Sequence, residues 1–254
     1  MSNKRQTRSR VKAETREIID ENFIDPWDNP NPIKRVIKVK QFVWTEKQKD
    51  FFKIALNHDT KIVFVNGPAG TAKTLLSVYC GLQLLNMKAI SDIMYLRSAV
   101  ESSDSKLGYL PGTAEDKLRF YNMPFLDKLD ELLPNTRAEK LENEGRISMF
   151  PVNFARGMNW TNKCVILDEA QNSSMKEITT VLTRLGKGSR CFVLADPMQT
   201  DLKGNMACGG FESMFSTFSD KESTDMGVHT FNFTEDDIMR SELCKFVIKK
   251  LNRA

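Results

Sequence analysis

The sequence predicts an α/β protein in which a mainly parallel β-sheet is covered by helices on both faces. From residue 61 onward, short β-branched and apolar runs alternate with longer segments of helical periodicity. Strands that alternate with helices need crossover connections, which place parallel strands side by side. Three of the expected strands run directly into glycine-rich or acidic sequence. Their polar groups should therefore collect at one edge of the sheet.

The elements expected after residue 60 are six strands, six helices and one long loop. The strands lie near residues 61–66, 92–97, 147–152, 163–168, 190–195 and 228–233. The helices lie near residues 73–89, 115–133, 137–143, 174–186, 209–218 and 236–251. The polar segment 98–114, which is marked by glycine and proline, is the longest connection and is typical of a functional loop.

The chain is expected to divide into a basic arm with a proline-rich linker, residues 1–32, and one domain, residues 33–254. The first twelve residues hold five lysines and arginines and no acid, although the formal net charge of the whole chain is only +4. Such an arm either binds phosphate backbones or only keeps the chain in solution. Three of the nine prolines follow within residues 25–32, which is typical of a stiff linker.

Two elements are expected between the linker and the first strand of the sheet. Residues 33–43 alternate in a way that is typical of an edge strand or β-ribbon. Residues 45–57 then form an amphipathic helical run. Its first residues, Thr45 and Gln48, have the spacing of a capping box.

Composition excludes several classes of protein. With 254 residues, of which 41% are hydrophobic, the chain can bury a core without disulfides. Its longest apolar runs are far shorter than the ~20 residues of a membrane-spanning helix, and the basic start lacks the apolar run of a secretory signal. The five cysteines form no CxxC pair and there are only two histidines. We therefore expect a reduced, cytoplasmic protein without a structural metal or a membrane partner.

The chemistry begins where an apolar strand runs into Gly67-Pro-Ala-Gly-Thr-Ala-Lys-Thr74 and then into a helix. This is the context of a phosphate-binding P-loop, in which backbone N–H groups and the helix dipole face a phosphate. Lys73 should reach the β- and γ-phosphates, and Thr74 should bind Mg²⁺. The expected nucleotide-binding residues are Gly67, Pro68, Ala69, Gly70, Thr71, Ala72, Lys73, Thr74 and Leu75. The usual pattern has glycine in place of Ala72, and a positive φ there would cost about 1–2 kcal/mol.

Two further strands deliver polar residues to the same edge. The strand near 163–168 ends in Asp168 and Glu169. Asp168 is expected to hold Mg²⁺ and Glu169 to polarise the attacking water, although acids at this position also cap helices. The strand near 190–195 is followed by Asp196 and Gln199. Gln199 could sense the γ-phosphate or the water, and an Asp-Pro turn would explain Asp196 equally well.

Together these motifs resemble the PhoH family of phosphate-starvation-inducible P-loop ATPases, whose RecA-like domain is similar to the motor domain of superfamily 1 helicases. The resemblance spans about residues 45–250. It is also carried by Leu107-Gly-Tyr-Leu-Pro-Gly112, by Asp168-Glu-Ala-Gln-Asn172 and by the segment that contains Arg240. The compact length with a basic arm is similar to versions encoded by tailed bacteriophages, which would place the protein in the host cytoplasm.

The resemblance implies Mg²⁺-dependent hydrolysis of ATP coupled to single-stranded nucleic acid, with RNA favoured over DNA and with translocation or unwinding. It offers Gln48 as a reader of adenine, unless that side chain only closes its capping box. It offers Arg97, Lys106 and Arg156 as contacts to nucleic acid, unless they lie on a solvated surface. The competing hypothesis is an ATP-gated nucleic-acid-binding or assembly module with slow turnover and no motor activity.

The last expectation concerns assembly. Phosphoryl transfer usually needs a cationic side chain on the γ-phosphate, and helicases supply it from a second motor domain that this chain lacks. Arg156, Arg184 and Arg240 are the candidates, with Arg240 preferred as the catalytic finger. A head-to-tail ring, most simply a hexamer, would bring this arginine into the site of a neighbouring subunit. The alternative is a monomer in which Arg240 is an ordinary surface arginine.

Overall fold

The six strands expected from the sequence form one parallel sheet. The computed structural model describes residues 29–97, 122–134, 137–155, 157–199 and 210–251. The strand order is β3-β2-β4-β5-β1-β6, and every neighbouring pair in this sheet is parallel. The strands are β1 (Ile62–Asn66), β2 (Asp92–Arg97), β3 (Ile147–Pro151), β4 (Lys163–Asp168), β5 (Arg190–Ala195) and β6 (Val228–Asn232).

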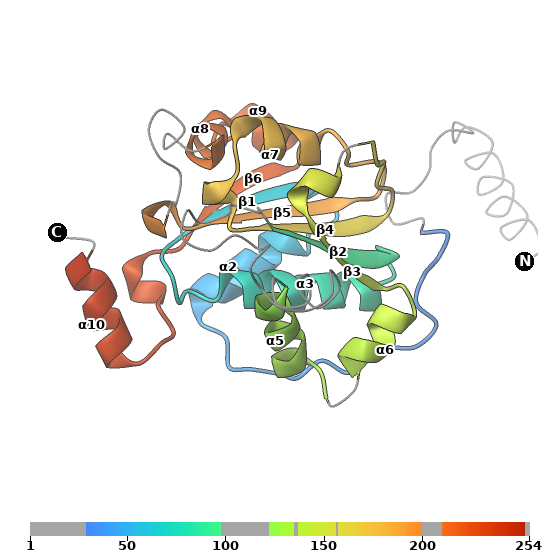
Figure 1. Ribbon diagram of the computed structural model, residues 1–254, viewed down its shortest axis with the longest axis horizontal. Coiled ribbons are helices and arrows are strands. Elements are labelled where there is room, and N and C mark those ends of the chain that lie inside the picture. Colours follow the sequence, from blue (N-terminus) through green and yellow to red (C-terminus); the bar gives the residue numbers. More distant parts are fainter. Residues whose placement is uncertain (1–28, 98–121, 135–136, 156, 200–209, 252–254) are drawn as a thin grey trace, which may run out of the picture.

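Helices cover both faces of the sheet, as predicted. They are α2 (Glu46–Ala55), α3 (Lys73–Asn86), α5 (Met123–Leu132), α6 (Arg137–Asn143), α7 (Met175–Leu182), α8 (Gly210–Thr217), α9 (Lys221–Asp225) and α10 (Glu242–Leu251). Helices α2, α3, α5 and α6 cover one face, α7, α8 and α9 cover the other, and α10 stands apart from both layers (Figure 1). None of the helices in the described part of the chain has the length and apolar character needed to cross a membrane.

The sheet separates two apolar cores, because alternate side chains of a strand point to opposite faces. On strand β4, Cys164 and Ile166 join the core under α3, whereas Val165 and Leu167 join the core under α7. All four side chains are fully buried. A strand buried on both faces reads as a continuous apolar run, which is why β4 and β5 were recognisable from the sequence.

Two expected elements are wrong. Residues 33–43 form no strand. Ile37 instead exchanges both of its backbone hydrogen bonds with the side chain of Asn86 at the end of α3, at 2.7 and 3.0 Å. The expected helix over 236–251 begins only at Glu242, because a short 3₁₀ turn, Glu235–Asp237, comes first. After that turn, the backbone N–H of Met239 donates to the carbonyl of Gly70 in the P-loop.

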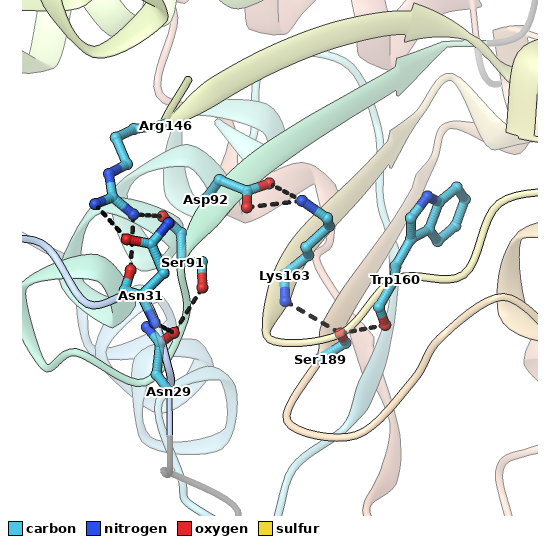
Figure 2. A network of polar contacts seen from close by, with 8 residues as sticks. All are labelled: Asn29, Asn31, Ser91, Asp92, Arg146, Trp160, Lys163 and Ser189. Atoms are coloured by element: carbon cyan, nitrogen blue, oxygen red, sulfur yellow. Dashed lines mark hydrogen bonds and ion pairs between the residues drawn. The ribbon is translucent and has the colours of Figure 1, made fainter. Parts of the chain in front are cut away.

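The segment that enters the domain is fastened to the amino ends of the strands (Figure 2). The hydroxyl of Ser91 donates to the side-chain oxygen of Asn29 at 2.6 Å. The guanidinium of Arg146 donates to the carbonyls of Asn31 and Ser91 at 2.7 and 2.8 Å. Residues 29–32, which the sequence places in the linker, are therefore held by the body of the protein. This network lies at the amino ends of β2 and β3, whereas the P-loop follows the carboxyl end of β1. Because all paired strands are parallel, the network and the P-loop lie at opposite ends of the strands.

Candidate nucleotide-binding site

The P-loop connects the carboxyl end of β1 to the first residue of α3, as the sequence predicts. Lys73 folds back over the loop, with its Nζ 2.6 Å from the carbonyl oxygen of Gly67 and 3.0 Å from that of Pro68. The buried hydroxyl of Thr71 also donates to Pro68, at 2.9 Å. These contacts hold the Lys73 ammonium against the P-loop, at the place where a bound phosphate would meet its charge.

Ala72 has the conformation that the P-loop pattern reserves for glycine. Its φ is +65° and its ψ is +22°, in the left-handed region, at the N-cap of α3. The strain anticipated from the sequence is therefore present. Contacts with neighbouring parts of the chain hold the P-loop in this strained conformation.

Two of these contacts come from the chain after β6. The backbone N–H of Phe233 donates to the carbonyl of Asn66 at 2.8 Å. A Cβ on Gly67 would lie 2.7 Å from the Cβ of Phe233, so only glycine allows this approach. A Cβ on Gly70 would lie 3.1 Å from the Cγ of Arg240. The segment after β6 therefore packs directly on the P-loop of the same chain.

Asp168 is buried beside the P-loop, with 6% of its surface exposed. Its Oδ2 accepts hydrogen bonds from the hydroxyls of Tyr95 and Thr74, at 2.9 and 3.0 Å. Burial raises the pKa of Asp168, and the nearby charge of Glu169 raises it further, whereas these hydrogen bonds oppose the shift. Asp168 thus faces Thr74 across the site and does not cap a helix, in contrast to the alternative considered from the sequence.

Glu169 is held from two sides. Its φ is +54°, in the left-handed region. Its Oε2 accepts a hydrogen bond from Nε2 of Gln171 at 2.6 Å, and its Oε1 lies 3.9 Å from Nη2 of Arg97. Gln171 was missed from the sequence as a site residue, because its role depends on contacts across the sheet. The only available signal was its place within the Asp168–Asn172 motif.

The turn after β5 completes the site. The Oδ1 of Asp196 accepts from the backbone N–H of Met198 at 3.1 Å, so Asp196 does shape the turn proposed for it. It also faces Lys73. Burial lowers the pKa of Lys73, whereas the charges of Asp196, Asp168 and Glu169 raise it. The exposed side chain of Gln199 borders the same cavity.

These residues line one cavity of about 390 Å³. Its predicted members are Ala69, Gly70, Ala72, Lys73, Thr74, Leu75, Asp168, Glu169, Gln199 and Arg240. The sequence missed Gln171 and also Lys128 and Glu131 of α5, which form an ion pair of 2.9 Å at the rim. A larger cavity of about 610 Å³ lies between residues 33–37 and the α6 region. Its lining includes no residue of the P-loop and neither Asp168 nor Glu169.

Gly67, Pro68 and Thr71 belong to the P-loop but do not line the cavity, and the other predicted residues lie elsewhere. Gln48 is buried and closes the capping box with Thr45 through bonds of 3.0 and 3.2 Å, and it does not line the cavity. Arg97 lies outside the cavity, beside Glu169. Arg184 does not line the cavity either. Lys106 and Arg156 lie outside the described residues.

The oxygen atoms of Thr74 and Asp168 suit a magnesium ion. Both are hard donors of the kind that Mg²⁺ prefers, and both belong to a cavity that also holds the P-loop lysine. Protein ligands of Mg²⁺ are usually few, because water and substrate phosphates complete its coordination. The residues present therefore fit the ion that the sequence implies.

A parallel sheet with a phosphate-binding loop after β1 and an acid at the end of β4 defines a P-loop NTPase. Comparison with known families is in agreement with this class. The chain belongs to the PhoH family: the family model described as "PhoH-like protein" matches residues 41–252.

Curated relatives extend beyond the matched region. The chain is 32% identical over 219 residues to the PhoH-like protein of Synechocystis sp., covering 86% of this chain and 63% of that protein. It is 32% identical over 211 residues to the PhoH-like protein of Bacillus subtilis, covering 83% and 64%. For protein PhoH of Escherichia coli, 32% identity covers 73% and 51%. The chain thus spans about half to two thirds of the length of these relatives.

Solved structures of Pif1 helicases have limited structural similarity to this chain. Bacteroides sp. Pif1 in complex with ADP-AlF4 matches with a TM-score of 0.38 and 16% identity, over 82% of this chain and 45% of that chain. Candida albicans Pif1 matches with a TM-score of 0.36 and 14% identity, over 76% and 41%.

Proposed function

We propose that this protein binds Mg²⁺-ATP in the P-loop cavity and hydrolyses it, and that hydrolysis is coupled to single-stranded nucleic acid, with RNA favoured over DNA. One observation carries the proposal. Lys73, Thr74, Asp168 and Glu169, from two separate strand–loop units, meet in a single cavity of about 390 Å³. Family membership supports ATP as the nucleotide.

Positioning and charge neutralisation do most of the work in phosphoryl transfer. The backbone N–H groups at the start of α3 and the Nζ of Lys73 would hold the phosphates. Thr74 and Asp168 would hold Mg²⁺, which neutralises charge on the β- and γ-phosphate oxygens when bound. The hydroxyl of Tyr95 keeps Asp168 oriented toward Thr74.

Glu169 is the proposed acceptor of a proton from the attacking water. As the water oxygen bonds to the γ-phosphorus, the bond from phosphorus to the β–γ bridging oxygen breaks and ADP leaves. The proton passes to the carboxylate of Glu169. Gln171 supports this role, because its bond of 2.6 Å fixes one carboxylate oxygen. Gln199 borders the cavity from the β5 side and is proposed to sense the γ-phosphate or the water.

Arg240 is proposed to contact the nucleotide phosphates from within its own chain. In the head-to-tail ring expected from the sequence, Arg240 would enter the site of a neighbouring subunit. Its side chain instead packs on Gly70 and lines the cavity of its own P-loop. A cation at this place can neutralise charge that develops during phosphoryl transfer, a contribution of about 10³–10⁵ in rate where it has been measured.

Nucleic acid is proposed to bind near Arg97, at the carboxyl end of β2. The side chain of Arg97 is partly exposed and lies against Glu169, so a ligand there would be adjacent to the catalytic group. Lys106 and Arg156 remain proposed contacts, and RNA is preferred on the strength of the family resemblance. The competing function, an ATP-gated binding or assembly module, shares the same cavity.

The test is ATP turnover by the full chain, with and without Mg²⁺, poly(U) or poly(dT). We expect turnover that needs Mg²⁺ and rises with poly(U) more than with poly(dT). Lys73→Ala should reduce turnover at least ~100-fold, as expected for a charge that acts on the transferred phosphate. Lys53→Ala, at an exposed lysine of α2, is the matched control and should have no effect. Slow turnover that nucleic acid does not change would favour the binding module.

A further inference from the structure

The position of β4 in the sheet gives Glu169 two different neighbours. Strand β4 lies between β2 and β5, and β1 with its P-loop lies beyond β5. Glu169 follows the last residue of β4. The cavity for the nucleotide is therefore on the β5 side of Glu169, and β2 is on the side away from it. A side chain on β2 that attracts Glu169 therefore restrains it from the side of β4 opposite β5.

Arg97 is such a side chain. It is the last residue of β2 and pairs in register with Asp168 of β4. Its Nη2 lies 3.9 Å from Oε1 of Glu169, and the two side chains are 26% and 36% exposed. Glu169 lines the nucleotide cavity, whereas Arg97 does not. Arg97 therefore acts on the proposed catalytic carboxylate from outside the cavity.

Gln171 holds the other oxygen of the same carboxylate. Its Nε2 lies 2.6 Å from Oε2 of Glu169, and its Oε1 accepts from the backbone N–H of Asp196 at 3.1 Å. Gln171 is buried, with 3% of its surface exposed. This anchor connects Glu169 to the β5 side of the sheet, which is the side of the nucleotide.

We propose that Arg97 restrains Glu169 in the protein free of nucleic acid, and that a phosphodiester backbone bound to Arg97 releases it for catalysis. Gln171 is the positioning residue that keeps the released carboxylate at the cavity. This inference rests on the proposed function of Glu169 as proton acceptor. It adds the path by which nucleic acid would stimulate hydrolysis.

The strengths of the contacts favour this exchange. An ion pair between partly exposed side chains at 3.9 Å is weak, because water screens it. A guanidinium binds a phosphate group through two parallel hydrogen bonds, which is a stronger and more directional contact. Phosphate therefore competes well for Arg97, while the short bond from buried Gln171 persists.

The experiment compares ATP turnover of the full chain in wild type, Arg97→Gln and Arg97→Lys, without nucleic acid and with increasing poly(U). Arg97→Gln should raise the rate without nucleic acid by about two- to fivefold, the factor expected for loss of an exposed ion pair. Poly(U) should then add little. Arg97→Lys keeps a positive charge beside Glu169, so its rate without nucleic acid should rise less than that of Arg97→Gln. Arg35→Gln removes an exposed arginine at the opposite edge of the sheet and is the control for loss of charge.

A rate for Arg97→Gln at or below that of wild type, without nucleic acid and with an unchanged melting temperature, overturns the inference. Arg97 would then be only a nucleic-acid contact. Gln171→Ala adds a second readout: it should lower kcat and leave the KM for ATP unchanged. Its effect should not add to that of Arg97→Gln, because both residues act on one carboxylate. Additive effects would contradict the shared restraint.

Failure of the proposed function looks different. If wild type hydrolyses ATP but responds to neither poly(U) nor poly(dT), coupling to nucleic acid is wrong, and release by a phosphodiester is overturned with it. The rates without nucleic acid would still show whether Arg97 restrains Glu169. If no variant hydrolyses ATP, the hydrolase assignment itself fails.

Discussion

Ala72 adopts a left-handed conformation that a residue with a Cβ occupies at a cost of about 1–2 kcal/mol. Ala72→Gly should remove this strain, raise the free energy of unfolding by up to ~1 kcal/mol and tighten ATP binding. Ala69→Gly is the matched control, because Ala69 has no positive φ and glycine there only loosens the unfolded chain. Thermal unfolding and ATP titrations of both variants check the prediction. Equal effects of the two substitutions would contradict it.

Asp168 illustrates a conflict between stability and activity. Among the residues that the structure describes, no cationic side chain forms an ion pair with its buried carboxylate, and burial raises its pKa above the ordinary value of 3.8. The folded state then binds the proton more tightly than the unfolded chain, so this contribution to stability falls as the pH rises above that value. Asp168→Asn removes the charge but can keep the bonds to Tyr95 and Thr74, whose hydroxyls can reverse direction.

We expect Asp168→Asn to abolish hydrolysis and to raise the melting temperature at pH 7 without nucleotide. For a chain of this size, ~1 kcal/mol corresponds to about 2–4 °C. The gain should vanish below about pH 4, where wild type is also protonated. Melting curves at both pH values, without added Mg²⁺, provide the measurement. A less stable variant at pH 7 would mean that the buried charge is better compensated than this account holds.

At the scale of elements, strands and helices differed in how well the sequence revealed them. Strands β4 and β5 were predictable because burial on both faces requires continuous apolar runs. Residues 33–43 misled because their alternation reflects two isoleucines anchored in the core, Ile33 and Ile37, and not a ladder of strand hydrogen bonds. The start of α10 was misplaced because Met239 bonds to the P-loop, a contact with no local signal.

The candidate site shows the same division. Lys73 and Thr74 could be found because P-loop chemistry fixes their spacing, and Asp168 because it is an acid at the carboxyl end of a buried strand. Gln171 could not be assigned a role, because it holds Glu169 while it is itself anchored to Asp196, in the turn after another strand. The place of Arg240 against its own P-loop depends on how the chain turns after β6, which composition and periodicity do not report.

Helix α10 exposes an apolar face that no other described element covers. Leu243, Phe246 and Val247 are 74%, 58% and 44% exposed and recur at helical spacing. Exposed apolar stripes of this kind usually mark contact with another molecule. We expect Phe246→Glu to lower self-association. Val43→Glu is the control, because Val43 is 97% exposed but does not belong to α10. Light scattering on both variants measures the difference, and equal particle masses would contradict a role for α10.

For the whole molecule, a hexameric ring stays a prediction, supported by this face of α10. A particle of 29.0 kDa in the presence of ATP, at protein concentrations where the ATPase is fully active, would contradict the ring. The place of Arg240 changes the mixing test. Because Arg240 lines its own cavity, a mixture of Arg240→Ala and Lys73→Ala should stay inactive. Restored activity would show that Arg240 acts across a subunit interface.

The central claim is that this cavity hydrolyses ATP with Glu169 as the proton acceptor. The most direct measurement follows ATP labelled at its γ-phosphate in a single turnover with excess protein. Wild type should release labelled phosphate. Glu169→Gln should bind ATP and retain it intact, because the amide keeps the shape of the site but cannot accept the proton. Release of phosphate by Glu169→Gln at the wild-type rate would contradict the account.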